Sequence, residues 1–362
     1  MKNPTHSPSK RLSRPLAGAV LLSGIAVLLA ACSSGASGGG GEGSPDALTT
    51  VGYGGAVDEA SYEAIGAPFG EEFGVEVLPD SPLDYSKIKA QVDADNVSWD
   101  VVKVEPYWAI QNCGTYLEPI DTSRIENIDQ LPEEAVLECG VPLDIFGFVM
   151  VYDHDVFSES APTSWADFFD VEKYPGKRAI WNFPSGMALE AALLADGVPA
   201  DELYPLDIDR ALAKLDTIRD HLVFYDTGAL QTEQIESGEV VMSIAWSARM
   251  VDALRNDAPF SAVWDDHFIL YDTLSIVKGS QAADLAHDYL NFAVQTPQQE
   301  RFAELMPYAP ANLEAKPQLD EFAKLMDLNA PDVAQKAILI DQQWYADHFD
   351  ELSGIWTKWS VG

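Results

Sequence analysis

The amino-acid sequence predicts an α/β protein with two lobes, for three reasons. Predicted strands and helices alternate along the chain, an order that indicates a mainly parallel sheet with helices on both faces. Two long apolar runs, at 145–153 and 268–279, could each cross from one lobe to the other. Roughly 315 residues follow the N-terminal segment, which is too many for one ordinary hydrophobic core. Two lobes joined by the crossing runs account for all three observations.

In the first half of the chain, hydrophobic periodicity and turn residues predict strict alternation of strands and helices. The predicted elements are a strand and turn at 48–55, a helix at 58–74, a strand at 75–78, an amphipathic helix at 84–95 and a strand at 98–105. The first crossing run follows after a longer irregular stretch.

The second half continues the alternation. A helix at 163–170 is expected to be capped by Thr163 or Ser164, and a helix at 185–197 to begin at Ser185 and end near Gly197. The other predicted elements are strands at 177–183, 222–226 and 240–246, and helices at 207–221, 231–239 and 247–256. The second crossing run comes next, and from residue 282 the chain is predicted to be helical with Pro and Asn breaks.

Residues 1–31 have the layout of an export signal, because a basic segment without acids precedes an apolar stretch that ends in small residues. The apolar stretch is shorter than the about 20 residues that a transmembrane helix needs. The segment Leu29-Ala30-Ala31-Cys32 resembles the bacterial lipobox, which implies a lipid on Cys32; a plain cleaved signal is the alternative. Residues 32–46 are predicted to be a flexible Gly/Ser tether. The folded part is then expected at the outer face of the cell membrane.

Export leaves Cys113 and Cys139 in an oxidising environment. A disulfide between them would close a loop of about 26 residues and contribute about 3 kcal/mol. Two separate buried thiols are the alternative. A metal site is not expected, because no histidine lies near either cysteine.

The chain is strongly acidic, with 22 basic and 58 acidic residues and a net charge of −36. Like charges repel, so nucleic acid and an anionic membrane face are excluded as partners. The acidity by itself does not establish a cationic ligand, because acidic surfaces also serve solubility. No cofactor is indicated.

Several motifs occur in the order typical of one family. They are PTSWADFFDVEKYPGKRAI, LEAALLADGV, GEVVMSIAWSARM, YDTLSIVKGS and YAPAN, spread over nearly the whole chain after the tether. In this order they resemble the substrate-binding proteins of ABC importers, in the branch that includes the spermidine/putrescine binders. The resemblance implies a type II periplasmic-binding-protein fold, whose hinge-linked lobes close on a ligand in the cleft between them.

With that fold, the lobe boundaries are predicted from the crossing runs. The first lobe would comprise 47–148 and about 273–310, and the second 149–272 and about 311–362. The family works as a monomer that delivers its ligand to the transmembrane subunits of a permease, so the same partners are expected here.

The physical argument for a site does not depend on the family. In open α/β sheets, ligands bind beyond the carboxyl ends of the strands, so the strand-to-helix turns are where to look. These turns and the second crossing run carry aromatic and charged residues: Tyr53, Glu105, Tyr107, Trp181, Asn182, Asp226, Thr227, Trp246, Ser247, Tyr271 and Asp272. Aromatic residues at four of these turns and on the crossing run favour ligand contact over simple core packing.

The resemblance to polyamine binders also implies roles for individual residues. Trp246 would pack on the methylenes of the ligand, Asp272 would pair with an amine, and Tyr53, Tyr107 and Tyr308 would be aromatic walls. The motif departs from the family in WNFPSGMALE. There Pro184 and Met187 stand where a polyamine binder has two carboxylates, and Glu190 is the nearest acid. A buried ammonium without a paired charge is costly, so this departure weakens the case for a long polyamine.

Arg249 adds a different possibility. A guanidinium on the first turn of the helix after Trp246 could hold a carboxylate through two hydrogen bonds. Together with Glu105 and Asp272, it would suit a ligand that carries both an amine and an acid. In the alternative, Arg249 pairs with Asp252 or Asp257 on the surface.

Other classes fit the sequence less well. The serine before a helix at 185 lacks a G-x-S-x-G elbow and a partner histidine, so an enzyme is not predicted. A ferric-ion binder would use clustered tyrosines together with an anion; Tyr271 and Tyr308 are available, but no adjacent pair of tyrosines occurs in the sequence. A sensor or adhesin could use the same two lobes. The sequence therefore predicts a lipoprotein that captures a small amine-bearing, polyamine-like solute for an ABC importer, with an amino-acid-like zwitterion or a carboxylate as the alternative ligand.

Overall fold

The structure is a computed structural model, and it describes residues 46–362. The predicted signal segment 1–31, the lipid anchor Cys32 and nearly all of the tether 32–46 lie outside the described residues. Within 46–362, no helix combines the length and apolarity that crossing a membrane requires.

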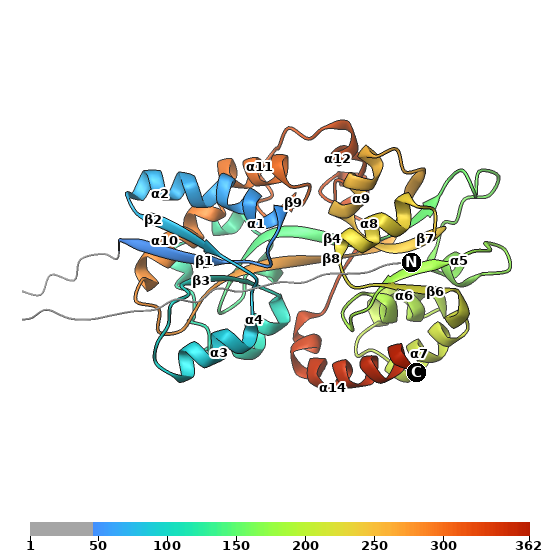
Figure 1. Cartoon of the computed structure of the whole chain (residues 1–362), viewed down its shortest axis with the longest axis horizontal. Helices are drawn as coiled ribbons and strands as arrows, with labels where there is room; N and C mark the ends of the chain where they lie inside the picture. Colours follow the sequence, from blue (N-terminus) through green and yellow to red (C-terminus); the bar gives the residue numbers. More distant parts are fainter. Residues whose placement is uncertain (1–45) are drawn as a thin grey trace, which may run out of the picture. The chain divides into compact units, whose positions relative to one another are not determined.

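Strands and helices alternate over most of the chain, as the sequence predicts (Figure 1). The strands are β1 (Ala47–Val51), β2 (Glu76–Asp80), β3 (Val101–Val104), β4 (Val141–Asp153), β5 (Arg178–Trp181), β6 (Leu222–Tyr225), β7 (Met242–Trp246), β8 (Phe260–Ile276), β9 (Ala309–Pro310) and β10 (Ala337–Leu339).

The helices follow in chain order. They are α1 (Ala56–Ser61), α2 (Ala67–Phe73), α3 (Tyr85–Asp93), α4 (Pro106–Asn112), α5 (Trp165–Phe169), α6 (Ala188–Ala195), α7 (Ile208–Asp216), α8 (Gly228–Glu236), α9 (Ser247–Arg255), α10 (Ala283–Ala293), α11 (Thr296–Leu305), α12 (Glu321–Leu325), α13 (Pro331–Ala334) and α14 (Gln342–Val361). A π-helical turn at Tyr62–Gly66 joins α1 to α2, and short 3₁₀ turns occur at Thr122–Arg124, Ile128–Gln130, Glu133–Ala135, Ala200–Glu202 and Arg219–His221.

The strands form one mixed sheet in the order β2-β1-β3-β8-β4-β7-β5-β6, with β9 paired to β4 and β10 to β8. On one side β1 is parallel to β2 and β3, and on the other β5 is parallel to β6 and β7. We call β1–β3 the first-lobe strands and β5–β7 the second-lobe strands. Parallel pairing inside each group agrees with the sequence prediction.

The first predicted crossing run, 145–153, falls within β4, and the second, 268–279, covers the second half of β8 and extends three residues past its end. These are the two longest strands among residues 46–362, and they lie side by side in Figure 1. β8 pairs with β3 on the first-lobe side, and β4 pairs with β7 on the second-lobe side. These pairings are antiparallel, as is the pairing of β4 with β8. The prediction of a mainly parallel sheet is therefore corrected at its centre, because a strand that returns from one lobe to the other must run against its neighbour.

Side-chain caps explain where several helices begin. Asp84, Asp207, Thr227 and Asp341 each accept a hydrogen bond from a backbone N–H in the first turn of α3, α7, α8 and α14, respectively. Two predicted caps do not form as expected. Ser164 is the N-cap residue of α5, as predicted, but its side chain makes no capping hydrogen bond; instead, Asp167 in the first turn accepts hydrogen bonds from Thr163 and Ser164.

The second predicted cap, Ser185 at the start of α6, is wrong. Helix α6 begins three residues later, after Met187, which has a positive φ of 60°. The chain needs this extra turn because residues 183–187 fold back on Trp181 before the helix starts: Gly186 donates a hydrogen bond to the Phe183 carbonyl. The predicted end of the helix is confirmed, because Gly197, with φ +86°, directly follows Asp196.

The C-terminal helix α14 packs on both groups of elements. Phe349 stacks on Tyr107 of α4 with ring centroids 4.2 Å apart, on the first-lobe side. Trp356 donates to Asn182 after β5 at 3.3 Å, and Trp359 donates to Asp216 at the end of α7 at 2.8 Å. Figure 1 shows α14 running past α4 and α7. The end of the chain thus helps to hold the two lobes together around the space between them.

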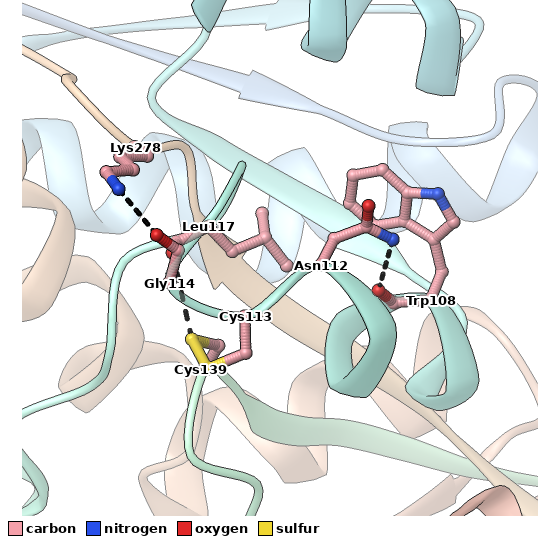
Figure 2. The surroundings of a disulfide bond; sticks show 7 residues. All are labelled: Trp108, Asn112, Cys113, Gly114, Leu117, Cys139 and Lys278. Carbon is pink, nitrogen blue, oxygen red and sulfur yellow. Dashed lines mark hydrogen bonds between the residues drawn. A yellow bond between two sulfur atoms is a disulfide. The ribbon is translucent and has the colours of Figure 1, made fainter. Parts of the chain in front are cut away.

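The predicted disulfide is present. Cys113, at the end of α4, is bonded to Cys139, just before β4, with Cα atoms 5.4 Å apart, a usual distance for this bond. Figure 2 shows the bond beside Gly114, whose carbonyl accepts a hydrogen bond from Lys278, and beside the last turn of α4, where Asn112 donates to the Trp108 carbonyl at 2.9 Å. The bond therefore ties the C-terminal end of α4, whose N-terminal end carries Glu105 and Tyr107, to the first crossing strand.

Removing this bond is expected to lower stability clearly. The double variant Cys113→Ala/Cys139→Ala opens a loop with a sequence separation of 26, and should lose about 3 kcal/mol of unfolding free energy. Urea unfolding of both proteins measures the difference. Dithiothreitol should lower the stability of the unmodified protein to that of the variant and leave the variant unchanged. An equal effect of the reductant on both proteins would contradict the assignment.

Candidate functional site

A cavity of about 400 Å³ lies where the predicted strand-to-helix turns meet. Its walls come from the ends of β1, β3, β5, β6 and β7, from the crossing strands β4 and β8, and from the start of α14. The volume lies within the range of small-molecule sites. Because β1 and β3 belong to the first lobe and β5–β7 to the second, both lobes contribute to the cavity.

Eight of the nine predicted ligand-binding residues line this cavity: Tyr53, Glu105, Tyr107, Trp181, Trp246, Arg249, Asp272 and Tyr308. They come from seven different elements or turns, spread over most of the chain. The rule that ligands bind beyond the carboxyl ends of strands therefore finds the right place. Whether each residue touches a ligand stays a prediction.

Tyr271 is not brought together with the others. It packs with Ile145 and Leu328 and lines a separate cavity beside the disulfide. The reason is the alternation of side chains in a strand, since neighbours on β8 point to opposite faces of the sheet. Asp272 and Leu270 face the main cavity, and Tyr271, between them, faces away.

Aromatic rings form the second-lobe wall. Trp181 and Trp246 stand at the ends of β5 and β7, with ring centroids 4.7 Å apart and edge to face. Phe148 on β4 stacks on Trp181 at 5.9 Å, and Phe183 stacks on it at 4.5 Å. The side chain of Gln231 accepts a hydrogen bond from the backbone N–H of Trp246 at 3.0 Å and so fixes the turn after β7. The wall is rigid and apolar, which suits the methylene groups of a ligand.

The first-lobe end is acidic. Glu105 stands between β3 and α4, because Pro106 starts the helix directly after it. Among residues 46–362, its Oε2 atom and the hydroxyl of Tyr53 are buried without a hydrogen-bond partner. Burial, with a smaller contribution from Asp272, raises the pKa of the Glu105 carboxyl to about 7. A cationic ligand group at this end would supply the missing partner.

Asp272 was predicted to pair with a ligand amine, but it already has a cationic partner. The ammonium of Lys103, on β3, lies 2.7 Å from Asp272 and 3.2 Å from Asp144. All three side chains are buried. Burial alone would lower the pKa of the lysine, but Asp144 and then Asp272 raise it above its ordinary value, so the ammonium stays charged. One oxygen of Asp272 is therefore committed to the protein itself.

Arg249 combines the two predicted positions, since it lies at the cavity and is also paired with Asp252. It lines the cavity from the first turn of α9, and its Nη1 lies 3.4 Å from Asp252. The side chain lies flat against Gly228 at the start of α8, where an added Cβ would stand 2.5 Å from Nε. The contact with Asp252 is long and half exposed, so the guanidinium keeps donors for a second anion.

The departure in the WNFPSGMALE segment is also resolved. Pro184 and Met187 are buried and do not line the cavity. From this segment, Trp181 and Ser185 line it. Glu190 is fully buried on α6, and its Oε1 accepts hydrogen bonds from Tyr204 at 2.9 Å and Tyr345 at 2.6 Å. It holds the cavity-lining Tyr345 in place and does not itself reach the cavity.

The sequence reasoning missed two groups of residues. Gln342 and Tyr345 reach the cavity from α14, which follows the short strand β10. This strand was not predicted from the sequence, so the turn rule was not applied there. Lys103 lies in an otherwise apolar four-residue strand, VVKV, all of it buried. A lysine inside such a strand is itself the signal, because a buried ammonium requires acidic partners. Within residues 46–362, no three His, Cys, Asp or Glu side chains gather in a way that could hold a metal ion.

Comparison with known proteins establishes the family. Residues 64–330 match the bacterial extracellular solute-binding proteins. The chain belongs to this family. The solute-binding protein is 33% identical over 321 residues to the gamma-aminobutyric acid-binding protein of Pseudomonas aeruginosa (strain PAO1), a match that covers 87% of this chain and 91% of the relative. The predicted family is confirmed, and its spermidine/putrescine branch stays a prediction.

Solved structures agree with the two-lobed fold. The Atu4243–GABA receptor is 35% identical, with a TM-score of 0.80 over 86% of this chain and 97% of the other. An ABC transporter substrate-binding protein from Bradyrhizobium japonicum USDA 110 is 31% identical, also with a TM-score of 0.80, over 87% and 99% of the two chains. These relatives are binding proteins and not enzymes, in line with the class expected from the sequence.

Proposed function

We propose that this solute-binding protein captures a short ω-amino acid such as 4-aminobutyrate (GABA). The observation that carries the proposal is the polarity of the cavity. Arg249 stands at the second-lobe end, where the other charged lining residue, Asp226, accepts a hydrogen bond from Asn182 at 3.1 Å. Glu105 and Asp272 stand at the first-lobe end, and aromatic rings line the space between the two ends. A ligand with a carboxylate, a few methylenes and an ammonium would satisfy all three parts.

The names of two relatives support the same ligand class, because one is a gamma-aminobutyric acid-binding protein and another is a GABA receptor. A polyamine is the competing ligand. It would leave Arg249 beside a second ammonium, and like charges in a poorly solvated cavity repel strongly. The amino-acid-like ligand is therefore preferred here over the polyamine.

The wider function follows the family. We propose that the protein works as a monomer, tethered to the outer face of the membrane by a lipid on Cys32, and delivers its ligand to the transmembrane subunits of an ABC importer. The lobe boundaries near residues 148, 273 and 310 belong to the same proposal. Closure would take place by bending of β4 and β8, the two strands shared by the lobes.

Four compounds with the same four-carbon chain test the ligand. They are 4-aminobutyrate, with both charged groups; putrescine, with two amines; butylamine, with one amine; and butyrate, with the acid alone. A ligand that binds only the folded state raises the unfolding temperature. Only 4-aminobutyrate is expected to raise it strongly at millimolar concentration. A larger shift with putrescine would favour the polyamine instead, and chemical conversion of any of the four would show an enzyme.

Binding is also expected to depend on pH through Glu105. In the free protein this carboxyl has a pKa of about 7, so it is mostly protonated below that pH. A ligand ammonium favours the ionised form, and binding below pH 7 must therefore release a proton. Affinity should fall by up to about tenfold per pH unit as the pH drops below 7. Calorimetry in buffers with different ionisation enthalpies measures both the affinity and the released proton.

Two variants separate this effect from a general effect of acid. Glu105→Gln should bind more weakly at pH 8 and show a flat pH profile, because nothing at this position titrates. Glu202→Gln, on an exposed turn, should keep the profile of the unmodified protein. A profile that stays steep in Glu105→Gln would assign the pH dependence to another group.

A further inference from the structure

The ammonium of Lys103 is surrounded by the kinds of groups that would bind the ammonium of a ligand. This lysine is on β3, and its two acidic partners, Asp144 on β4 and Asp272 on β8, stand directly opposite each other in the sheet. The lysine side chain is only 4% exposed. Two carboxylates from the crossing strands therefore enclose the protein's own ammonium just behind the cavity wall.

Aromatic rings complete this subsite. The ammonium of Lys103 lies 5.5 Å from the ring centroid of Tyr308 and 5.8 Å from those of Tyr53 and Phe302. These distances fall within the range of cation–π attraction. The polyamine resemblance assigned Asp272 to a ligand amine, and Tyr53 and Tyr308 to the aromatic walls around the ligand. The groups that would bind a second ligand amine are thus present, and a side chain of the same chain uses them.

We infer that Lys103 determines specificity: acting through Asp272, it lets the cavity accept a ligand with one ammonium and makes it reject diamines. The inference rests on the proposed function, because it explains why an amino acid is preferred over a polyamine at the same site. Lys103 does not itself line the cavity. It acts by neutralising a carboxylate that does.

The charges at the first-lobe end support this step. Two cavity-lining carboxylates, Glu105 and Asp272, face the space where a ligand amine would lie. With Lys103 in place, Asp272 shares its charge with an internal cation, and Glu105 is the only one of the two without a cationic partner within residues 46–362. One ligand ammonium then satisfies this end, and a second ammonium at this end finds no free carboxylate. The third cavity-lining carboxylate, Asp226, follows β6 at the second-lobe end, where Arg249 also stands.

The test removes the internal cation together with one acid, so that the net charge does not change. Lys103→Met/Asp144→Leu replaces the buried pair with apolar side chains, which proteins often tolerate well. Lys103→Gln/Asp144→Asn replaces it with amides that can still hydrogen-bond. Both variants free Asp272 for a ligand. Lys177→Met/Glu239→Gln, which removes an exposed ion pair with an N–O distance of 3.3 Å, is the matched control.

Putrescine and 4-aminobutyrate are titrated into each protein by calorimetry, and folding is checked by circular dichroism. In at least one of the two buried-pair variants, putrescine is expected to bind at least about 100-fold more tightly than to the unmodified protein. The ratio of the affinity for putrescine to the affinity for 4-aminobutyrate should therefore rise. The control should keep the ligand preference of the unmodified protein.

Three results would overturn the inference. The first is that putrescine binds the unmodified protein as tightly as 4-aminobutyrate does. The second is that the folded variants gain no affinity for putrescine. The third is that neither variant folds, which would make the pair a structural requirement. Failure of the proposed function looks different. The unmodified protein would then not bind 4-aminobutyrate, whereas the gain in putrescine affinity between unmodified and variant protein would still be measurable.

Discussion

Replacing Arg249 by alanine is expected to weaken 4-aminobutyrate binding by at least about 100-fold, or about 2.7 kcal/mol. The guanidinium is the basic group that lines the cavity at its second-lobe end, and its removal leaves the ligand carboxylate without a partner in a largely apolar space. Arg249→Lys keeps the charge but loses the planar pair of donors, so a smaller loss of about tenfold is expected. Isothermal titration calorimetry measures all three proteins.

The same helix supplies the control. Arg255, at the other end of α9, pairs with Asp320 at 2.7 Å on the surface, and Arg255→Ala should leave the affinity within about twofold. The polyamine alternative predicts the reverse for Arg249→Ala, because removal of a like charge would strengthen binding of a diamine. Unchanged 4-aminobutyrate affinity in Arg249→Ala would show that the ligand acid binds elsewhere.

The position of Arg249 also links ligand chemistry to lobe closure. Arg249 and Trp246 follow the second-lobe strand β7, whereas Glu105 follows the first-lobe strand β3. A ligand with an acid at one end and an amine at the other would bind both lobes at once. A ligand shifts a conformational equilibrium only by its difference in affinity for the two states. Butyrate or butylamine would contact one lobe well, and should therefore favour closure much less than the zwitterion.

Much of the site could be predicted from the sequence because of a general property of α/β sheets. Parallel strands bring their carboxyl ends to one edge, so that Tyr53, Glu105, Trp181 and Trp246 meet although they are far apart in the chain. Predicting which residues lie at the turns requires only the positions of the strands. Short apolar runs in the sequence indicate these positions. The two crossing runs were equally clear, because a long apolar stretch without a helical pattern indicates a strand buried on both faces.

The sequence could not predict contacts that depend on which face a residue occupies or on distant packing. Tyr271 and Asp272 are adjacent, and only the register of β8 against β4 decides which of them faces the cavity. Tyr345 reaches the cavity because α14 returns to pack on α4, and no local pattern encodes that return. The polyamine prediction depended on Asp272 being free, and the partner that occupies it, Lys103, becomes its neighbour only when β3 pairs with β8.

Lys103→Met alone is expected to lower the unfolding free energy by about 3–5 kcal/mol, because it leaves buried carboxylates without their cation. The loss should be seen in urea unfolding at pH 7.5. Lys177→Met, which removes an exposed lysine paired with Glu239, should change stability by less than about 1 kcal/mol. The charge-matched variant Lys103→Met/Asp144→Leu should recover part of the loss, since it removes one of the unpaired acids as well.

The loss in Lys103→Met should also depend on pH, and the sign follows from linkage. Burial already raises the pKa of Asp144 with the lysine present, and removal of the cation raises it further. A carboxyl whose pKa is higher in the folded than in the unfolded state binds more protons when folded, so its cost to stability grows as pH rises above the unfolded value. The gap in unfolding free energy between Lys103→Met and the unmodified protein should therefore narrow as the pH is lowered from 8 to 5. A gap that stays constant over this range would mean that the variant loses packing of the lysine side chain, and that the buried carboxylates are not the cause.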